Sequence, residues 1–467
     1  MKRKLNICLL NNVVPHVSLA STSIPLSILY LGTYLKRENH NVDILDRRTF
    51  KSDKSCIDAM KATNPDLVGI SFYSNGYTIT FEQVNRIRRI SKSLKIVLGG
   101  PEVSVNREGV ANIFKNVDYF LAGEAELTLM QLANSLAEHD EKQIQSIEGL
   151  SYRQNGEIYH NPLPEPIKDI DSFLFPNRDL IDNEIVRKHY FRPGLKKPTD
   201  VIITSRGCPF SCNFCSQYIP RYRARSPENV LEEISELYKR GVRGLQIQDD
   251  SFTINPKRSS KILEGICERG WKLSISLRGR VDKVNPQFVR LMKRAGVRSM
   301  TLGIESGSQK ILDAMNKKTT VEQNFRAIQL VRNAGMACYV DFFIGYPGET
   351  RSTIKETSEF LLKAKPHGIN MGVLFPLHGS TVYNEAKEKG TLVGKWGVLE
   401  DDPWVKLPWI EDIEELWDIW HSIQKLFWNN RRIVLGIVKR HLFMFDFNDY
   451  WNLLKRIICI KLKLGIN

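Results

Sequence analysis

Residues 200–217 read DVIITSRGCPFSCNFCSQ, so an apolar, strand-like run leads directly into three closely spaced cysteines. Cys208, Cys212 and Cys215 follow the spacing C-x3-C-x2-C. A structural zinc site needs four ligands, usually as two separated pairs, and the chain has no second C-x2-C pair and no H-x3-H pair. Three thiolates fit a four-iron cluster best, because such a cluster can leave one iron open for another ligand. A zinc site and a redox thiol are the alternatives.

The composition is that of an ordinary globular protein, and 467 residues are enough for two or three domains. The net charge of +15 is compatible with nucleic acid, an anionic membrane surface or anionic ligands, and it selects none of them. No apolar run reaches about 18 residues, which argues against a transmembrane span. The opening MKRKLNICLL has too short an apolar part for a signal peptide and is typical of a first strand.

Five further cysteines are scattered over apolar segments, as reduced core residues usually are: Cys8, Cys56, Cys267, Cys338 and Cys459. Free thiols of this kind indicate a reducing compartment. We therefore expect a cytoplasmic protein.

Residues 1–144 alternate short apolar runs with helical patterns, with strands expected at 5–10, 41–45, 66–71, 95–100 and 118–123. Strands and helices in this order predict a doubly wound parallel sheet of the Rossmann-like type. Ligands of such sheets bind at the carboxyl ends of the strands. Those ends carry the following segments: Ser71 to Ser74, Gly99 to Glu102, and Gly123 with Glu124.

Residues 145–199 differ from the segment before them. The stretch SIEGLSYRQNGEIYHN (146–161) predicts a hairpin around Asn155-Gly156, because this dipeptide favours a tight turn. Six prolines follow between Pro162 and Pro198. We interpret the whole region as a linker between domains and not as a continuation of the first sheet.

Six strand–helix units return in residues 200–390. Repeated units of this kind predict a parallel barrel, and an incomplete (β/α)6 barrel is expected, since a full eight-stranded barrel typically needs about 250 residues. Chemistry in such barrels lies at the carboxyl ends of the strands. The cysteine trio stands there, directly after the first strand.

Residues 391–467 are rich in tryptophan and in basic pairs, and a mostly helical region is expected. Two interpretations stay open: a helical cap on the barrel with a solvated basic face, or a surface that lies against a membrane. Binding of nucleic acid is not expected, because no known DNA- or RNA-binding module is present.

The segment GCPFSCNFCS resembles the cluster loop of the radical S-adenosylmethionine (SAM) superfamily. Further segments resemble the branch of that superfamily with an N-terminal cobalamin-binding domain, and the resemblance covers roughly residues 1–390. The segments that carry it are IPLSILYLGTYLKRENHNVDILD (24–46), VLGGPEVS (97–104), AGEAELTL (122–129), IQDDSFTIN (247–255), LRGRVD (277–282), LGIESGSQKIL (302–312) and FIGYPGET (343–350).

This resemblance implies three cofactors: a 4Fe-4S cluster on Cys208, Cys212 and Cys215, SAM on the open iron, and cobalamin. It implies that Asp249 and Asp250 contact the methionyl amine of SAM, that Glu305 accepts hydrogen bonds from the ribose, and that the backbone at Gly345 and Pro347 approaches the adenine. The alternatives are a solvated turn at the aspartates, a helix cap by Glu305 and a plain strand-to-helix turn at Gly345.

For cobalamin, the resemblance implies close backbone approach at Gly99 and Gly100, a hydrogen bond from Ser71 to the nucleotide tail, and contacts from Gly123 and Glu124. A nucleotide-binding domain is the competing interpretation, but no G-x-G-x-x-G follows the first strand. The loop after that strand also lacks the D-x-H-x-x-G pattern of proteins whose histidine ligates cobalt. We therefore expect cobalamin to be held without His16.

The reaction implied is methylation of an unactivated carbon in a small or lipid-like substrate, with a flavodoxin- or ferredoxin-type electron donor and peripheral membrane contact as further expectations. The alternative within the family is a non-methylating cyclisation or rearrangement, as in porphyrin-cyclase-like or hopanoid-modifying enzymes. The alternative outside it is a non-catalytic corrinoid sensor.

Overall fold

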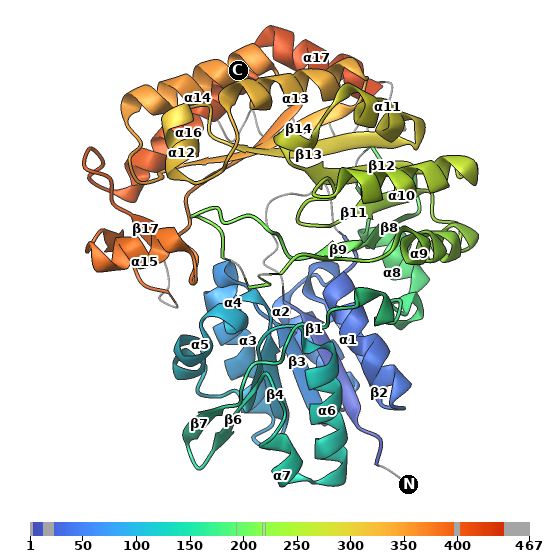
Figure 1. Ribbon diagram of the computed structural model, residues 1–467. Coiled ribbons are helices and arrows are strands. Elements are labelled where there is room, and N and C mark those ends of the chain that lie inside the picture. The colour runs from blue at the N-terminus through green and yellow to red at the C-terminus, as the bar shows by residue number, and fades with distance from the viewer. Residues whose placement is uncertain are drawn as a thin grey trace.

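The protein forms two α/β domains, one above the other in Figure 1. The computed structural model describes residues 3–12, 23–192, 194–216, 218–219, 221–396 and 402–442. The cysteine loop runs between the two domains. His16 and residues 443–467 lie outside the described residues, so the predictions made for them stay predictions.

The N-terminal domain is built on a seven-stranded sheet of order β2-β1-β3-β4-β5-β6-β7. The first five strands run parallel, as predicted. Their bounds are β1 Asn6–Asn11, β2 Asn41–Asp46, β3 Leu67–Ser71, β4 Lys95–Gly99 and β5 Tyr119–Leu121. The strand order reverses between β1 and β3, and this switch point is where doubly wound sheets bind ligands.

Helices cover both faces of this sheet because its strand residues are apolar in both directions. Helices α1 (Leu26–Arg37) and α6 (Ala125–Glu138) pack on the face of Ile7 and Leu9. The opposite face, with Cys8 and Leu10, is covered by α2 (Asp53–Ala62), α3 (Tyr77–Ile90), α4 (Pro101–Val105) and α5 (Arg107–Ile113).

The hairpin that we assigned to the linker belongs to the sheet, and that prediction was wrong. Strand β6 (Leu150–Gln154) pairs antiparallel with β5, and β7 (Glu157–His160) pairs with β6. Asn155 and Gly156 both have positive φ, 51° and 86°, as a tight hairpin turn requires. The fully buried Leu150 explains the pairing, since it joins the core beneath β5.

The second domain is an open six-stranded parallel sheet of order β15-β14-β13-β12-β11-β8, which confirms the incomplete barrel. The strands are β8 Thr199–Ile202, β11 Gly244–Ile247, β12 Ser274–Gly279, β13 Val297–Glu305, β14 Ala337–Ile344 and β15 Gly368–Val373. Helices α13 (Val321–Asn333) and α14 (Arg351–Ala364) lie on the side of the sheet away from the N-terminal domain (Figure 1), so the concave face of the sheet turns toward that domain.

The helices of the barrel begin at strong local signals. Ser226, Asn255 and Asn285 each accept a hydrogen bond from the first turn and are each followed by proline, the preferred first helical residue. The helices are α9 Pro227–Lys239, α10 Pro256–Glu268, α11 Pro286–Arg294, α12 Gln309–Ala314, α13 Val321–Asn333 and α14 Arg351–Ala364.

The C-terminal region is helical as far as the structure describes it. Helix α15 (Thr381–Glu388) and the short strands β16 (Leu392–Val393) and β17 (Trp404–Val405) lead to α16 (Ile413–Trp428) and α17 (Arg431–Leu442). Helix α16 packs on β15 and α14, which favours the helical cap for this part of the region. No helix among the described residues is long and apolar enough to span a membrane.

The linker is anchored to the barrel by buried ion pairs. Arg178, in the short 3-10 helix Arg178–Leu180, contacts Glu233 at 2.7 Å and Asp200 at 3.5 Å. Glu233 on α9 also pairs with Arg225, and its side chain is 1% exposed. Because charges this deeply buried need their partners, the linker can dock on the barrel in one position only.

Glu233→Ala tests this anchor. The variant leaves Arg178 and Arg225 buried with fewer partners, so we expect a loss of about 3–5 kcal/mol in the free energy of unfolding of the barrel. Urea denaturation of the apoprotein, followed by far-UV circular dichroism, measures the change. The neighbouring Glu232 is exposed on the same helix, and Glu232→Ala should leave the midpoint unchanged. Equal midpoints for both variants would contradict the anchor.

Candidate functional site

A cavity of about 260 Å³ lies where the two domains meet. Its N-terminal wall consists of the carboxyl ends of β1, β3, β4 and β5 and the first turns of α1 and α6. Its other wall comes from the barrel, through Arg206, Tyr218 and Asp250 among others. All the residues predicted to contact cobalamin line it, namely Ser71, Gly99, Gly100, Gly123 and Glu124.

Glycine backbone forms the floor of the cavity. Gly100 has φ +133°, and a Cβ there would lie 2.3 Å from the carbonyl oxygen of Phe72, so no other residue fits. At Gly123, φ is +81° and a Cβ would meet no atom within 4 Å, which leaves open space beside the backbone. The Ser104 hydroxyl joins these loops, since it donates to the Gly100 carbonyl at 3.0 Å and accepts from the Gly123 N–H at 2.9 Å.

Ser71 reaches the cavity from the end of β3. Its hydroxyl accepts a hydrogen bond from the Asn12 N–H at 3.2 Å and donates to Asn11 Oδ1 at 3.3 Å. A hydroxyl can accept two hydrogen bonds. Ser71 therefore keeps one acceptor position for a ligand in the cavity but no free proton.

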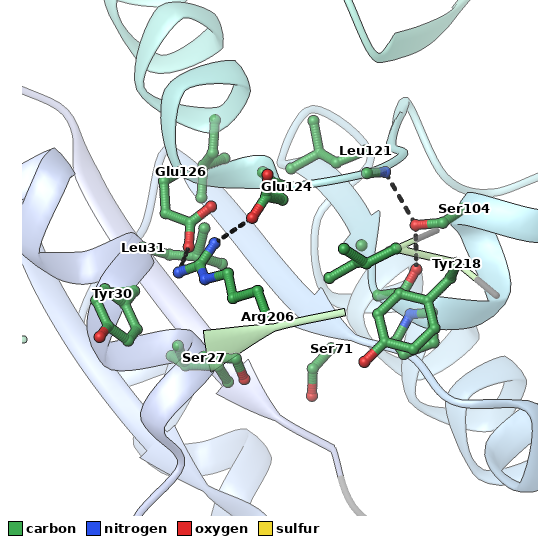
Figure 2. Close-up of a pocket in the computed structure, with 18 of the residues that line it drawn as sticks. Ser27, Tyr30, Leu31, Ser71, Ser104, Leu121, Glu124, Glu126, Arg206 and Tyr218 are labelled. Carbon is green, nitrogen blue, oxygen red and sulfur yellow. Dashed lines mark hydrogen bonds and ion pairs between the residues drawn. The ribbon is translucent and has the colours of Figure 1, made fainter. Parts of the chain in front are cut away.

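Glu124 joins the two domains. Its two oxygens accept hydrogen bonds from Arg206 and from Arg223, both at 2.7 Å. Arg206 also pairs with Glu126 at 2.7 Å and stacks on Phe173, with its guanidinium carbon 4.2 Å from the ring centre. Figure 2 shows Arg206 between Glu124 and Glu126 at the side of the cavity. We call this group the Arg206 clamp.

The electrostatics of the clamp are those of a tight ion pair. Burial alone would raise the pKa of Glu124, but the hydrogen bonds and charges of Arg223 and Arg206 hold it below its usual value. Burial would lower the pKa of Arg206, but the charges and hydrogen bonds of Glu126 and Glu124 raise it above its usual value. Neither arginine is among the site residues predicted from the sequence. The only signal was a basic residue two positions before the first cysteine of the trio.

The cysteine trio lies on the loop after β9 (Ser205–Arg206), and the barrel fixes the shape of this loop. The Asn213 N–H donates to the Met315 carbonyl at 3.0 Å, and the Ser216 hydroxyl donates to the His378 carbonyl at 2.7 Å. The Arg280 guanidinium lies 3.6 Å from the centre of the Phe210 ring. The loop is therefore held on three sides without any ligand.

The three thiols lie on one loop and differ in exposure. Cys208 and Cys212 are partly buried and Cys215 is exposed. In a four-iron cluster each thiolate binds a different iron, and three thiolates leave the fourth iron open. The loop therefore offers the set of ligands that such a cluster needs.

The two neighbouring aspartates have different positions. Asp249 is 2% exposed and accepts hydrogen bonds from the Thr204 N–H, the Thr204 hydroxyl and the Ser205 hydroxyl, at 2.6, 2.6 and 2.7 Å. It therefore holds the segment that leads into the cysteine loop. Asp250 lines the cavity, where the surrounding walls partly desolvate its carboxylate and, with the Asp249 charge, raise its pKa. Of the two, only Asp250 is placed to meet a ligand there.

Glu305 ends β13 on the concave face, with φ +58°. Its carboxylate pairs with the Lys317 ammonium at 2.6 Å, and the side chains are 12% and 8% exposed. Helix α12 begins later, after Ser308, and takes no side-chain cap, so Glu305 does not act as a helix cap. Lys317 is a further residue of this site that the sequence analysis did not identify.

The turn at Gly345 is held from within. Gly345 has φ +90°, and its N–H donates to Glu349 Oε2 at 2.6 Å, as the Tyr346 N–H does at 3.2 Å. Burial raises the pKa of Glu349 to about 7, although these two hydrogen bonds oppose the change. Pro347, which follows Tyr346 in the chain, is half-buried. The backbone of the turn is thus fixed by its own glutamate.

A second polar contact joins the domains on the other side of the cysteine loop. Glu102 is fully buried and accepts hydrogen bonds from Ser74 at 2.6 Å and Tyr77 at 2.8 Å. Its carboxylate lies 2.6 Å from His378 Nδ1, in the segment after β15. Glu102 therefore connects the N-terminal domain to the same segment that holds Ser216.

Comparison with known proteins agrees with this geometry. Residues 202–361 match the model of the radical SAM superfamily, and residues 14–133 match that of the B12 binding domain. An uncharacterised methyltransferase of Pyrococcus horikoshii is 31% identical over 374 residues, which are 78% of this chain and 79% of the relative. An anaerobic magnesium-protoporphyrin IX monomethyl ester cyclase of Rubrivivax gelatinosus is 27% identical over 78% of this chain and 66% of the relative.

Among solved structures, the radical SAM methyltransferase TsrM from Kitasatospora setae has a TM-score of 0.71 at 20% identity, over 88% of each chain. The two family matches and the relative from Pyrococcus horikoshii therefore show a radical SAM enzyme with a cobalamin-binding domain. The chain belongs to the family of cobalamin-dependent radical SAM enzymes that includes methyltransferases, and the cofactors of this family are a 4Fe-4S cluster, SAM and cobalamin.

Replacing Cys208, Cys212 and Cys215 together by alanine should abolish iron binding, because the cluster has no other thiolates in the loop. Anaerobic reconstitution followed by iron and sulfide analysis and by visible absorption measures this. Cys267 lies partly buried on α10, and Cys267→Ala should bind as much iron as the wild type. A wild-type protein that takes up only zinc would contradict the cluster.

The Arg206 clamp predicts a pH-dependent stability. The pKa of Glu124 in the folded protein lies below its value of about 4.3 in the unfolded chain. The ionised carboxylate therefore stabilises the fold above about pH 4.3, and this stabilisation is lost as the pH falls through the folded-state pKa. Glu124→Gln should cost about 3 kcal/mol at pH 7 and progressively less toward pH 3.5, as measured by urea denaturation. Glu157→Gln, at an exposed position on β7, serves as the control. A difference that does not change with pH would argue against the clamp.

Proposed function

We propose that this protein transfers a methyl group from SAM to an unactivated carbon of its substrate. The observation that carries the proposal is the shared cavity. The glycine-rich strand ends of the N-terminal domain and the segment that precedes Cys208 form two walls of one space. A methyl donor on the first wall and a SAM-derived radical from the second would then meet at one substrate.

The N-terminal side of the cavity would bind cobalamin, and the barrel side would bind the cluster and SAM. Gly99, Gly100 and Gly123 let a flat macrocycle approach the backbone, and Ser71 accepts one hydrogen bond from the cofactor's tail. On the barrel side, Cys208, Cys212 and Cys215 hold the cluster, Asp250 meets the methionyl amine and Glu305 meets the ribose. When bound, the cluster supplies the electron that cleaves SAM, and cobalamin supplies the methyl group.

The names of the relatives support methylation, and some of them support cyclisation as an alternative. The relative with 31% identity is named a methyltransferase, and a hopanoid C-3 methylase of Methylococcus capsulatus is 26% identical. Relatives named as magnesium-protoporphyrin ester cyclases, at 25–27% identity, favour a non-methylating cyclisation as the second candidate. The higher identity of the methyltransferase relative, 31% against 25–27% for the cyclases, favours methyl transfer.

We also propose the surroundings in which the enzyme works. Seven free cysteines among the described residues support the reducing cytoplasm. The exposed Cys215 supports access for a flavodoxin- or ferredoxin-type electron donor. Exposed Trp417, Leu426 and Leu435 on the C-terminal helices support a peripheral membrane contact.

The test is an anaerobic turnover with SAM that carries a deuterated methyl group. Reconstituted holoenzyme is incubated with a cell extract and a reductant, and products are followed by mass spectrometry. Methyl transfer predicts a product heavier by one CD3 group, formed together with 5′-deoxyadenosine. The triple cysteine variant should give neither compound.

The cyclase-type alternative predicts a different result. Extract-dependent formation of 5′-deoxyadenosine without deuterium in any product would replace methyl transfer by cyclisation. Absence of both compounds from the reconstituted holoenzyme would overturn the proposed function as a whole.

A further inference from the structure

Three polar side chains come together on the concave face of the barrel, outside the residues discussed so far. Arg278 on β12 lies 3.2 Å from Asp341 on β14, measured between Nη2 and Oδ2. Asn370 on β15 donates from Nδ2 to Asp341 Oδ1 at 2.7 Å. The Asp341 carboxylate is thus held from both sides, and it orients the Arg278 guanidinium.

The alternation of side chains along the strands fixes the face on which this group lies. Leu277, Val340 and Met371 belong to the core under the outer helices, so their neighbours Arg278, Asp341 and Asn370 point the other way. Gly303 on β13 pairs in register with Asp341. A Cβ at Gly303 would lie 2.5 Å from Glu305 Oε1, so the polar group shares its face with the proposed SAM residue.

The same group also lies near the shared cavity. Strand β12 lies between β11, which leads to Asp250, and β13, which ends at Glu305. The Phe252 N–H, two residues after Asp250, donates to the Arg278 carbonyl at 3.0 Å. Asp250 itself lines the cavity. Arg278 therefore stands between the Glu305 side of the barrel and the wall that faces the N-terminal domain. A substrate that meets both cofactors must occupy this region.

Stability does not explain these residues. The side chains of Arg278 and Asp341 are 56% and 27% exposed, and an ion pair with this exposure contributes about 0–1 kcal/mol. The space beside them is open, because a Cβ at Gly372, two residues after Asn370, would meet no atom within 4 Å. A guanidinium has five N–H donors, and the ion pair with Asp341 occupies one end of the group.

We propose that Arg278 binds an anionic group of the substrate, a carboxylate or a phosphate, and that Asp341 and Asn370 position its guanidinium. The inference rests on the proposed function, since it places the substrate between the two cofactors. A guanidinium matches the oxygens of such anions with two parallel hydrogen bonds. A neutral hydrocarbon at this place would take Arg278 and Asp341 out of water without new partners, at a substantial cost. The substrate class is therefore a polar anion and not a neutral lipid.

The test uses the reconstituted holoenzyme and extract fractions as probes. Cell extract is partitioned between water and chloroform–methanol, and both phases are separated on an anion exchanger. Each fraction is assayed for its ability to stimulate 5′-deoxyadenosine formation, a readout that does not depend on methylation. We expect stimulation by an anion-retained fraction, from the aqueous phase for a metabolite and from the organic phase for a phospholipid. Phosphatase treatment should abolish stimulation only if the anion is a phosphate monoester.

Variants separate recognition from folding. Arg278→Gln should lower the stimulation at limiting substrate by about 10-fold or more, mainly through KM, while 5′-deoxyadenosine formed without extract stays at the wild-type level. Arg278→Lys keeps the charge but loses the paired donors, so an intermediate value is expected. Arg290 is exposed on α11, outside the barrel lumen, and Arg290→Gln should behave as the wild type.

Stimulation by a neutral lipid fraction, undiminished in Arg278→Gln, would overturn the inference while methyl transfer stands. Loss of the extract-independent reaction in Arg278→Gln would also overturn it, since the residue would then act on SAM or on folding. Failure of the proposed function is a different result: an anionic, Arg278-dependent stimulation without deuterium transfer would support this site and replace methylation by cyclisation.

Discussion

The ion pairs of Arg206 are the interaction on which the rest of the site depends. Arg206 stands two residues before Cys208, and its partners Glu124 and Glu126 follow the end of β5 in the other domain. All three side chains are at most 12% exposed. Removing one partner from such a group costs about 3–5 kcal/mol, so the two domains cannot slide without a large penalty. The distance between the cysteine loop and the glycine-lined wall is thereby fixed.

The clamp also explains how the two domains share one chemistry. Parallel sheets leave their carboxyl ends open, and here the open ends of two sheets face one cavity. The N-terminal domain contributes backbone, since Gly100 and Gly123 leave no side chain in the way. The barrel side contributes polar side chains to the cavity, namely Arg206, Tyr218 and Asp250. Glu102 and His378 hold the opposite side of the cysteine loop, so the loop is fixed at both ends.

Much of this arrangement could be predicted from the sequence because its strands are apolar runs of regular spacing. The partners of charged residues could not, since Glu124 lies 82 and 99 residues before the two arginines that bind it. The hairpin was misassigned for a related reason: a turn signal predicts two paired strands but not the third strand beside them. Strand geometry could have distinguished Asp249 from Asp250 in the sequence. Adjacent residues of an extended segment point to opposite sides, so only one of Asp249 and Asp250 can face a ligand.

The ion pairs of this protein are of two kinds. Buried pairs hold one structural element against another, and an exposed pair on the concave face is available to a ligand. Arg178, Arg206 and Arg225 are at most 12% exposed, and each is bound to at least one buried carboxylate. Such groups fix the position of one element against another. Arg278 is 56% exposed and lies on the concave face that turns toward the other domain. This pair adds little to stability, so its place on that face is better explained by binding of the substrate, which must then carry a negative charge.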